Sequence, residues 1–197
     1  MKKMLFVAAF AVFGMGMSNA QEENTGGYSQ GDLFVTGSIG ISTESTGDRK
    51  ENTLEFAPSV GYFVSDNIAI GLGLGLSSSK FEEPGVVDFE STTIAIEATG
   101  RYYVTPSSQF SLFGQLSVAY LSVENEQGAF ESNTDGFGLG IAPGVSYFIS
   151  NNFALEATVG ILSYSSVELD GASDSTNSFD LGLNFTNVNL GLVYKFN

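Results

Sequence analysis

Apolar and small residues alternate with a period of two along almost the whole chain after Gly31. In the stretch 68–77, Ile and Leu occupy the even positions, whereas Ala, Gly and Ser occupy the odd positions. A period of two places alternate side chains on opposite faces of an extended strand. The alternation predicts eight strands, near residues 31–43, 53–64, 68–77, 92–104, 110–121, 136–149, 153–165 and 179–196.

The connections between these strands alternate in length. The short ones are 65–67, 105–109 and 150–152, and the longer, acidic ones are 44–52, 78–91, 122–135 and 166–178. An even number of antiparallel strands, joined alternately by short periplasmic turns and long external loops, is typical of bacterial outer-membrane barrels. The expected fold is therefore all-β, an eight-stranded antiparallel up-and-down transmembrane β-barrel over residues 31–197.

The two faces of the predicted strands differ in chemistry. One face carries Leu, Ile, Val and Phe, and the other carries mostly Gly, Ala, Ser and Thr. Small residues suit the interior of an eight-stranded barrel, whereas the outer surface of a soluble barrel needs charged residues. A lipocalin-like barrel, with its apolar face inward, is the alternative. We expect lipid to contact Leu33, Val35, Ile39, Ile41, the even-numbered residues of 68–76, Ile94, Ile96 and Tyr102.

An internal repeat supports the hairpin organisation. Residues 57–69 recur as residues 142–154, with the shared pattern Ala-Pro-x-Val-x-Tyr-Phe-[Val/Ile]-Ser-x-Asn-x-Ala. The prolines at positions 58 and 143 lack an N–H donor, so we interpret them as bends or bulges. A slip in the alternation near Thr186-Asn187 predicts a further bulge.

Four tyrosines stand at the turn end of the apolar face. Because Tyr has an apolar body and a polar tip, a ring of tyrosines marks a boundary between membrane and water. The predicted interface girdle consists of Tyr62, Tyr102, Tyr147 and Tyr194.

The first twenty residues have the pattern of a cleavable signal peptide. Lys2 and Lys3 form a basic start, residues 4–17 are uncharged and apolar, and Ser18-Asn19-Ala20 supplies small residues for cleavage after Ala20. A short membrane anchor is the alternative, but fourteen apolar residues are too few for a spanning helix. Residues 21–30 are then a short polar lead before the barrel.

Composition narrows the range of partners. Without Lys2 and Lys3, the chain has five basic residues against 22 acidic ones, so nucleic acid is not an expected partner. The absence of Cys excludes an acylated lipoprotein cysteine and disulfides. No cofactor is expected.

The repeated hairpins and the ending Asn189-Leu190-Gly191-Leu192-Val193-Tyr194-Lys195-Phe196 resemble the outer membrane protein β-barrel domain and porin-family proteins. The resemblance covers residues 31–197, a length similar to the OmpX- and OmpA-type barrels. It implies a monomer in the cell outer membrane, with lipid as its surroundings. The last strand also resembles the signal read by the barrel-assembly machinery, although Asn197 follows the final aromatic residue.

Five charged residues fall on the inward face of the predicted strands. A charge in a narrow lumen is costly unless it is paired, so a structural salt-bridge network is the first interpretation. We expect the Arg101 guanidinium to bridge carboxylates from different strands, with one excess acid toward the extracellular end. A paired-carboxylate acid/base site is the alternative. The predicted lumen charge network consists of Glu55, Glu97, Arg101, Glu156 and Lys195.

Inward-facing aromatic residues close to the short turns predict a plug at the periplasmic end. Phe63, Tyr103 and Phe148 each precede a short turn by two residues, and Phe113 should stack just above them. Because eight strands leave a lumen only as wide as the side chains that fill it, we expect the plug and the charge network to seal the barrel.

Other motifs carry less information about function. The chain has no His, whereas the known outer-membrane barrel enzymes that it resembles in architecture use a His base, so a triad hydrolase is not expected. The runs of alternate glycines at 71–75 and 136–140 lack the spacing of a dinucleotide fingerprint. Acids in the long connections suit either solvated loops or divalent cations; they are Glu82, Glu83, Asp88, Glu90, Glu124, Glu126, Glu131, Asp135, Glu168, Asp170 and Asp174.

These observations leave three hypotheses for function. The first is a non-enzymatic surface protein that contributes to membrane integrity or contacts an unidentified extracellular ligand through its acidic connections. The second is a narrow, porin-like channel for ions or small solutes. The third is an enzyme that works without His.

Overall fold

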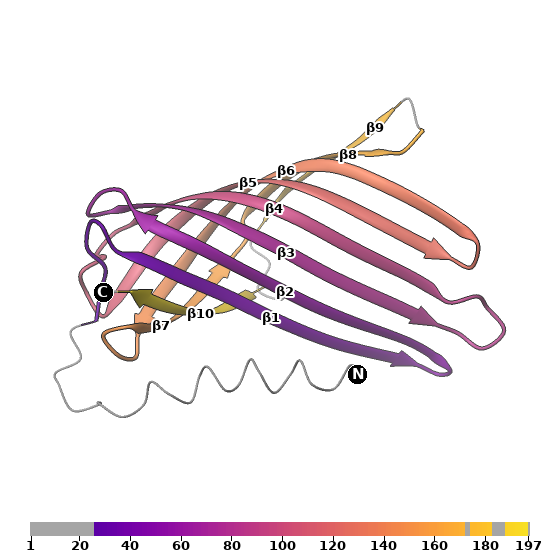
Figure 1. Cartoon of the computed structure of the whole chain (residues 1–197), viewed down its shortest axis with the longest axis horizontal. Helices are drawn as coiled ribbons and strands as arrows, with labels where there is room; N and C mark the ends of the chain where they lie inside the picture. Colours follow the sequence, from indigo (N-terminus) through magenta and orange to yellow (C-terminus); the bar gives the residue numbers. More distant parts are fainter. Residues whose placement is uncertain (1–25, 172–173, 183–187, 197) are drawn as a thin grey trace.

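The computed structural model describes residues 26–171, 174–182 and 188–196 of the chain, and these residues form ten strands (Figure 1). The predicted signal peptide, its cleavage site and the Thr186-Asn187 slip lie outside the described residues. Within the described ranges, no helix is long and apolar enough to cross a membrane. The strands are β1 (Leu33–Thr46), β2 (Arg49–Phe63), β3 (Ile68–Glu82), β4 (Phe89–Tyr103), β5 (Phe110–Gln127), β6 (Phe130–Phe148), β7 (Phe153–Val159), β8 (Leu162–Leu169), β9 (Ser175–Leu181) and β10 (Val188–Phe196).

Eight of the strands form a closed antiparallel ring. Strands β1 to β7 pair in chain order, and β10 closes the ring by pairing with both β7 and β1. Beyond the ring, strand β8 continues the line of β7 along β6, and β9 pairs with β8. Figure 1 shows this β8–β9 hairpin extending past the other strands. The predicted all-β, eight-stranded barrel is confirmed.

A bulge separates β7 from β8. Thr158 lies opposite Gly144, and Leu162 lies opposite Ile141. The three residues 159–161 between β7 and β8 therefore face only two residues of β6, 142 and 143. Pro143 is one of those two residues. A proline cannot supply a ladder N–H, and an extra residue on the neighbouring strand accommodates the missing bond.

The equivalent proline in the repeat behaves differently. Pro58 interrupts the pairing of β2 with β3, but Phe56 opposite Leu76 and Ser59 opposite Gly73 keep one register on both sides. Of the predicted bend or bulge, the bulge is therefore wrong at Pro58, and the bend stays a prediction. The sequence pattern around the two prolines is the same, and the register of the neighbouring strand decides the outcome.

The outer face of the barrel is apolar. The side chains of Ile70, Leu72 and Ile96 are 53%, 61% and 56% exposed, and those predicted to contact lipid on β1 point the same way. Most inward positions on the same strands carry Gly, Ala, Ser or Thr. The alternative of a soluble barrel with an apolar interior is wrong, because an exposed apolar belt of this size requires lipid around it.

The stretches predicted as long loops are mostly strand. Strands β2 to β6 are 15 to 19 residues long, whereas about 9–11 residues cross a bilayer. The excess forms hairpin extensions with tight tips, and the tips at 47–48 and 128–129 have only two residues. Gly47 and Gly128 begin these tips with positive φ, as two-residue hairpins require. The sequence did not predict these paired extensions, because both of their faces are solvated and no apolar–polar alternation marks them as strands.

The first and last strands of the ring, β1 and β10, pair only at one end of the barrel. Strand β1 pairs with β2 along its whole length, but it pairs with β10 only between Leu33–Gly37 and Leu192–Phe196. Among the described residues, positions 38–46 of β1 have no strand partner on that side. The closed end is therefore the end with the short turns, and the lumen at this end contains the candidate site.

Candidate functional site

Aromatic side chains close the turn end of the lumen. Tyr28 lies at the centre, with ring centroids 4.6 Å from Phe63, 4.8 Å from Phe148 and 5.3 Å from Tyr103. The Phe113 ring packs 4.9 Å from that of Tyr103. All of these side chains are 3% exposed or less. We call this cluster the aromatic floor; it consists of Tyr28, Phe34, Phe63, Tyr103, Phe113 and Phe148.

Tyr28 comes from the segment before β1 and enters the lumen from below. Its backbone N–H donates to the Pro106 carbonyl at 2.7 Å, and the Gly31 N–H donates to Phe63 at 2.9 Å. A Cβ added at Gly27 would lie 2.6 Å from the Ser107 carbonyl carbon. Glycine is therefore needed where this segment passes the β4–β5 turn.

Sequence reasoning found four of the six floor residues. Phe63, Tyr103, Phe113 and Phe148 come together as their inward positions imply. Tyr28 was missed because it lies in the polar lead, where no alternation signals burial. Phe34 was missed although it has the inward parity of β1, and its ring occupies the space that a side chain at Gly61 would fill.

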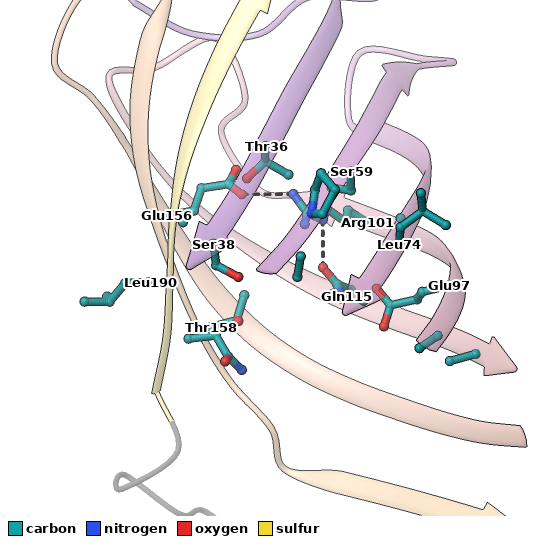
Figure 2. Close-up of a pocket in the computed structure, with 18 residues that line it drawn as sticks. Thr36, Ser38, Ser59, Leu74, Glu97, Arg101, Gln115, Glu156, Thr158 and Leu190 are labelled. Carbon is teal, nitrogen blue, oxygen red and sulfur yellow. Dashed lines mark hydrogen bonds and ion pairs between the residues drawn. The ribbon is translucent and has the colours of Figure 1, made fainter. Parts of the chain in front are cut away.

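A charged network lies directly on the floor, and Figure 2 shows its Arg101, Gln115 and Glu156 side chains. The Arg101 Nη1 donates to Glu156 Oε2 at 2.9 Å, and its Nε donates to Gln115 Oε1 at 2.7 Å. The hydroxyls of Tyr103 and Tyr28 donate to Glu156 Oε1 at 3.1 Å and 3.3 Å. Burial, together with the nearby Glu156 carboxylate, raises the pKa of the Tyr28 hydroxyl far above its usual value, so it stays protonated and can donate.

The five predicted lumen charges do not form one network. Arg101 pairs with Glu156, as expected, but it forms no ion pair with Glu97 within the described part of the chain. Lys195 instead donates to the Gly27 carbonyl at 2.7 Å and lies 3.5 Å from Asp32. It therefore fastens the Tyr28 segment to the last strand. Glu55 is exposed on the inward face, nearer the open end.

Above this network the lumen widens into a cavity of about 300 Å³. Small residues hollow its walls, because an inward Gly, Ala or Ser leaves the space that a larger side chain would fill. Glu97 lies on the wall beside Gln115, and Leu190 points away from the cavity (Figure 2). The polar and charged lining comprises Thr36, Ser38, Ser59, Glu97, Arg101, Gln115, Glu156, Thr158 and Asn189.

The remaining predicted residues lie outside the lumen. Lys80 contacts Glu82, Asp88 and Glu90 at 3.1, 3.1 and 3.4 Å on the outer side of β3 and β4. No group of three or more potential metal ligands gathers in the described ranges. The tyrosines of the predicted girdle are 37% to 57% exposed on the outer face near the short turns; they are Tyr62, Tyr102, Tyr147 and Tyr194.

The two acids that line the cavity, Glu97 and Glu156, differ in the chemistry that they can do. Glu156 is only 6% exposed and accepts hydrogen bonds from three side chains. A carboxylate held in this way stabilises packing and is poorly placed to exchange protons with a substrate. Glu97 is half-buried on the cavity wall and has no comparable set of donors in the described residues.

Comparison with known proteins gives one family match and several structural neighbours. The family model of the outer membrane protein beta-barrel domain matches residues 6–196. OprG from Pseudomonas aeruginosa has a TM-score of 0.56 at 16% identity, with 88% of this chain and 99% of that chain covered. A search of curated protein sequences gives no significant match.

Two further neighbours have the same level of similarity. Neisserial surface protein A has a TM-score of 0.50 at 16% identity, with 83% of this chain and 97% of that chain covered. The attachment invasion locus protein Ail of Yersinia pestis has a TM-score of 0.50 at 16% identity, with 85% and 99% covered. At this identity the neighbours establish the shared barrel fold alone.

Proposed function

The chain belongs to the outer membrane protein beta-barrel domain family, and we propose that it acts as a sealed, non-conducting barrel. Its role is to support the integrity of the outer membrane and to present acidic strand extensions to the exterior. It works without catalysis, as a monomer surrounded by lipid.

The aromatic floor is the observation that carries this proposal. Tyr28, Phe63, Tyr103 and Phe148 are all 0% or 1% exposed, so the lumen is packed from wall to wall at the turn end. A ring of eight strands has an interior just wide enough for side chains. A solute would have to displace these rings and the Arg101–Glu156 ion pair to pass.

The acidic strand extensions support a role at the cell exterior. Glu90, Glu126 and Glu131 lie in one cross-strand row on β4, β5 and β6. Adjacent like charges destabilise a sheet; Lys80 already lies 3.4 Å from Glu90, so Glu126 and Glu131 favour contact with further cations or basic groups. The Ail structure was also determined with a heparin analogue, sucrose octasulfate; an outer surface this acidic would repel such a polyanion.

Planar-bilayer recording of the mature barrel tests the proposal. We expect no steady conductance from the unaltered protein. The triple variant Tyr28→Ala/Phe63→Ala/Phe148→Ala removes the centre of the floor and should conduct. Tyr62→Ala, which truncates an aromatic ring on the outer face next to Phe63, serves as the matched control and should remain silent. Steady current through the unaltered barrel would favour the narrow channel instead.

A further inference from the structure

The cavity above the floor is blind at one end and open at the other. Along the inward face of β2, Phe63 is 0% exposed, Ser59 is half-buried, and Ala57 and Glu55 are exposed. Water therefore enters from the extracellular side and stops at the floor. A cavity of about 300 Å³ with this shape matches the lower end of the range for small-molecule sites.

Glu97 adds to this cavity a negative charge that forms no ion pair among the described residues, although the nearby Arg101 guanidinium attracts it. The Arg101 guanidinium, with a side chain only 11% exposed, is engaged by Glu156 and Gln115. The Lys195 ammonium is held below the floor by Gly27 and Asp32. Among the described residues, no other Lys or Arg forms an ion pair with a lumen carboxylate.

The rest of the lining adds oxygen acceptors to the cavity. Hydroxyls of Thr36, Ser38 and Ser59 line the cavity, and the Ser117 hydroxyl interacts with the Glu97 carboxylate. A primary ammonium group has three N–H donors, and one carboxylate with several hydroxyl oxygens can satisfy all three.

Other classes of ligand fit this lining less well. A divalent cation prefers several carboxylate ligands, and among the described residues of the lining Glu97 is the one acid that forms no ion pair. An anion would need the Arg101 guanidinium, which is already paired with Glu156. A neutral apolar compound would leave the Glu97 charge without a partner.

We propose that the lumen cavity binds a small organic compound through its primary ammonium group, with Glu97 as the anionic partner. This inference rests on the sealed floor, because a blind cavity retains a ligand that an open channel would pass. The ammonium group belongs either to a free amine or to the headgroup of a lipid.

Titration of the mature barrel with n-propylammonium chloride tests the proposal. In a non-ionic detergent, NMR should show saturable shifts at the amides of Gly73 and Ala119, which lie opposite Glu97 on β3 and β5. Loss of one charge-assisted hydrogen bond in Glu97→Gln should weaken binding about tenfold or more. Glu124→Gln makes the same change on the outer face of β5 and should bind as the unaltered protein does.

A second variant tests the cavity independently of its charge. Ala119→Leu fills the cavity wall opposite Glu97 and should also weaken binding. Binding that survives both Glu97→Gln and Ala119→Leu, or shifts confined to the outer acidic strands, would overturn the proposal. Competition by phosphatidylethanolamine in phosphatidylcholine bilayers would assign the ammonium group to a headgroup, and its absence would assign it to a free amine.

The bilayer recordings keep the two proposals separable. A silent barrel that fails to bind propylammonium would overturn the ligand site alone. A conducting barrel would overturn the sealed floor.

Discussion

Glu156 is the residue at which the lead segment and the barrel wall meet. Its carboxylate accepts hydrogen bonds from Tyr28, Tyr103 and Arg101, which come from the lead and from β4. The Arg101 guanidinium neutralises the Glu156 charge, and the two hydroxyls stabilise it by hydrogen bonds, which offsets the cost of its burial. The same contacts hold the Tyr28 ring in the middle of the floor.

Substitutions at Tyr28 should separate the contribution of its ring to stability from the contribution of its hydroxyl. Tyr28→Ala should lower the free energy of unfolding by about 3–5 kcal/mol, because it leaves a cavity among buried rings. Tyr28→Phe keeps the ring and loses only the hydrogen bond to the Glu156 carboxylate, so it should cost less, about 1.5–3 kcal/mol. Urea unfolding of the two variants in the same lipid would measure both values. Equal losses would contradict a floor built on ring packing.

Removing one member of the buried ion pair should cost more than removing both. Arg101→Met leaves the Glu156 charge unpaired and should destabilise the protein by about 3–5 kcal/mol. The double variant Arg101→Met/Glu156→Leu carries no unpaired charge and should recover most of that loss. A double-mutant cycle in urea provides the measurement, and additive losses would exclude the coupling.

At the scale of the elements, the seam between the first and last strands is the weakest part of the ring. Only five residue pairs join β1 to β10, whereas β1 and β2 pair along their whole length. The Lys195 contacts with Gly27 and Asp32 add a second connection, because they tie β10 to the segment that leads into β1.

The Lys195 connection predicts a local effect on this seam. Lys195→Met should increase hydrogen exchange of the β1 and β10 amides while leaving the β3–β4 amides unchanged. The physical reason is that local opening occurs where few contacts oppose it. Lys80→Met, on the outer side of β3, is the matched control. Exchange that rises uniformly around the ring would contradict a role at the seam.

The outward orientation of the apolar face also predicts a result for a single strand. Leu72→Arg places a charge in the apolar belt of β3 and should cost about 2–4 kcal/mol. Ser78→Arg lies on the same face, six residues nearer the open end, and should cost about 0–1 kcal/mol. Unfolding from lipid vesicles would measure both losses. Leu72→Arg with unchanged stability would contradict the assignment of this face to lipid.

At the scale of the whole molecule, the barrel divides into a sealed end and an open end. The floor, the Arg101–Glu156 pair and the β1–β10 seam all lie toward the short turns. The cavity, Glu55 and the acidic strand extensions lie beyond them. If the short turns face the periplasm, as expected, the cavity exchanges solutes with the exterior without passage through the membrane.

Deleting the polar lead before β1 should leave the barrel folded but open its lumen to ions. A mature barrel that lacks residues 21–31 keeps every strand of the ring, so we expect it to insert and to retain its β-sheet circular dichroism. It should conduct in planar bilayers, because Tyr28 no longer fills the floor. A deletion variant that folds and stays silent would show that the remaining rings suffice.

The sequence by itself determined the membrane-crossing part of the strands, the orientation of their faces and the class of fold, but not the strand extensions beyond the membrane. These follow from a period of two, which each strand carries locally and which needs no knowledge of its neighbours. Phe63, Tyr103 and Phe148 were predictable for the same reason, since parity and distance from a turn place them inward at one level.

Only the tertiary structure decided which side chains meet across the lumen. Partners there depend on the stagger of the strands around the ring, which no local pattern encodes. Arg101 therefore pairs with Glu156 rather than Glu97, and Lys195 reaches the lead instead of the network. Tyr28 lies in the floor because a closed ring leaves a space that this segment can fill.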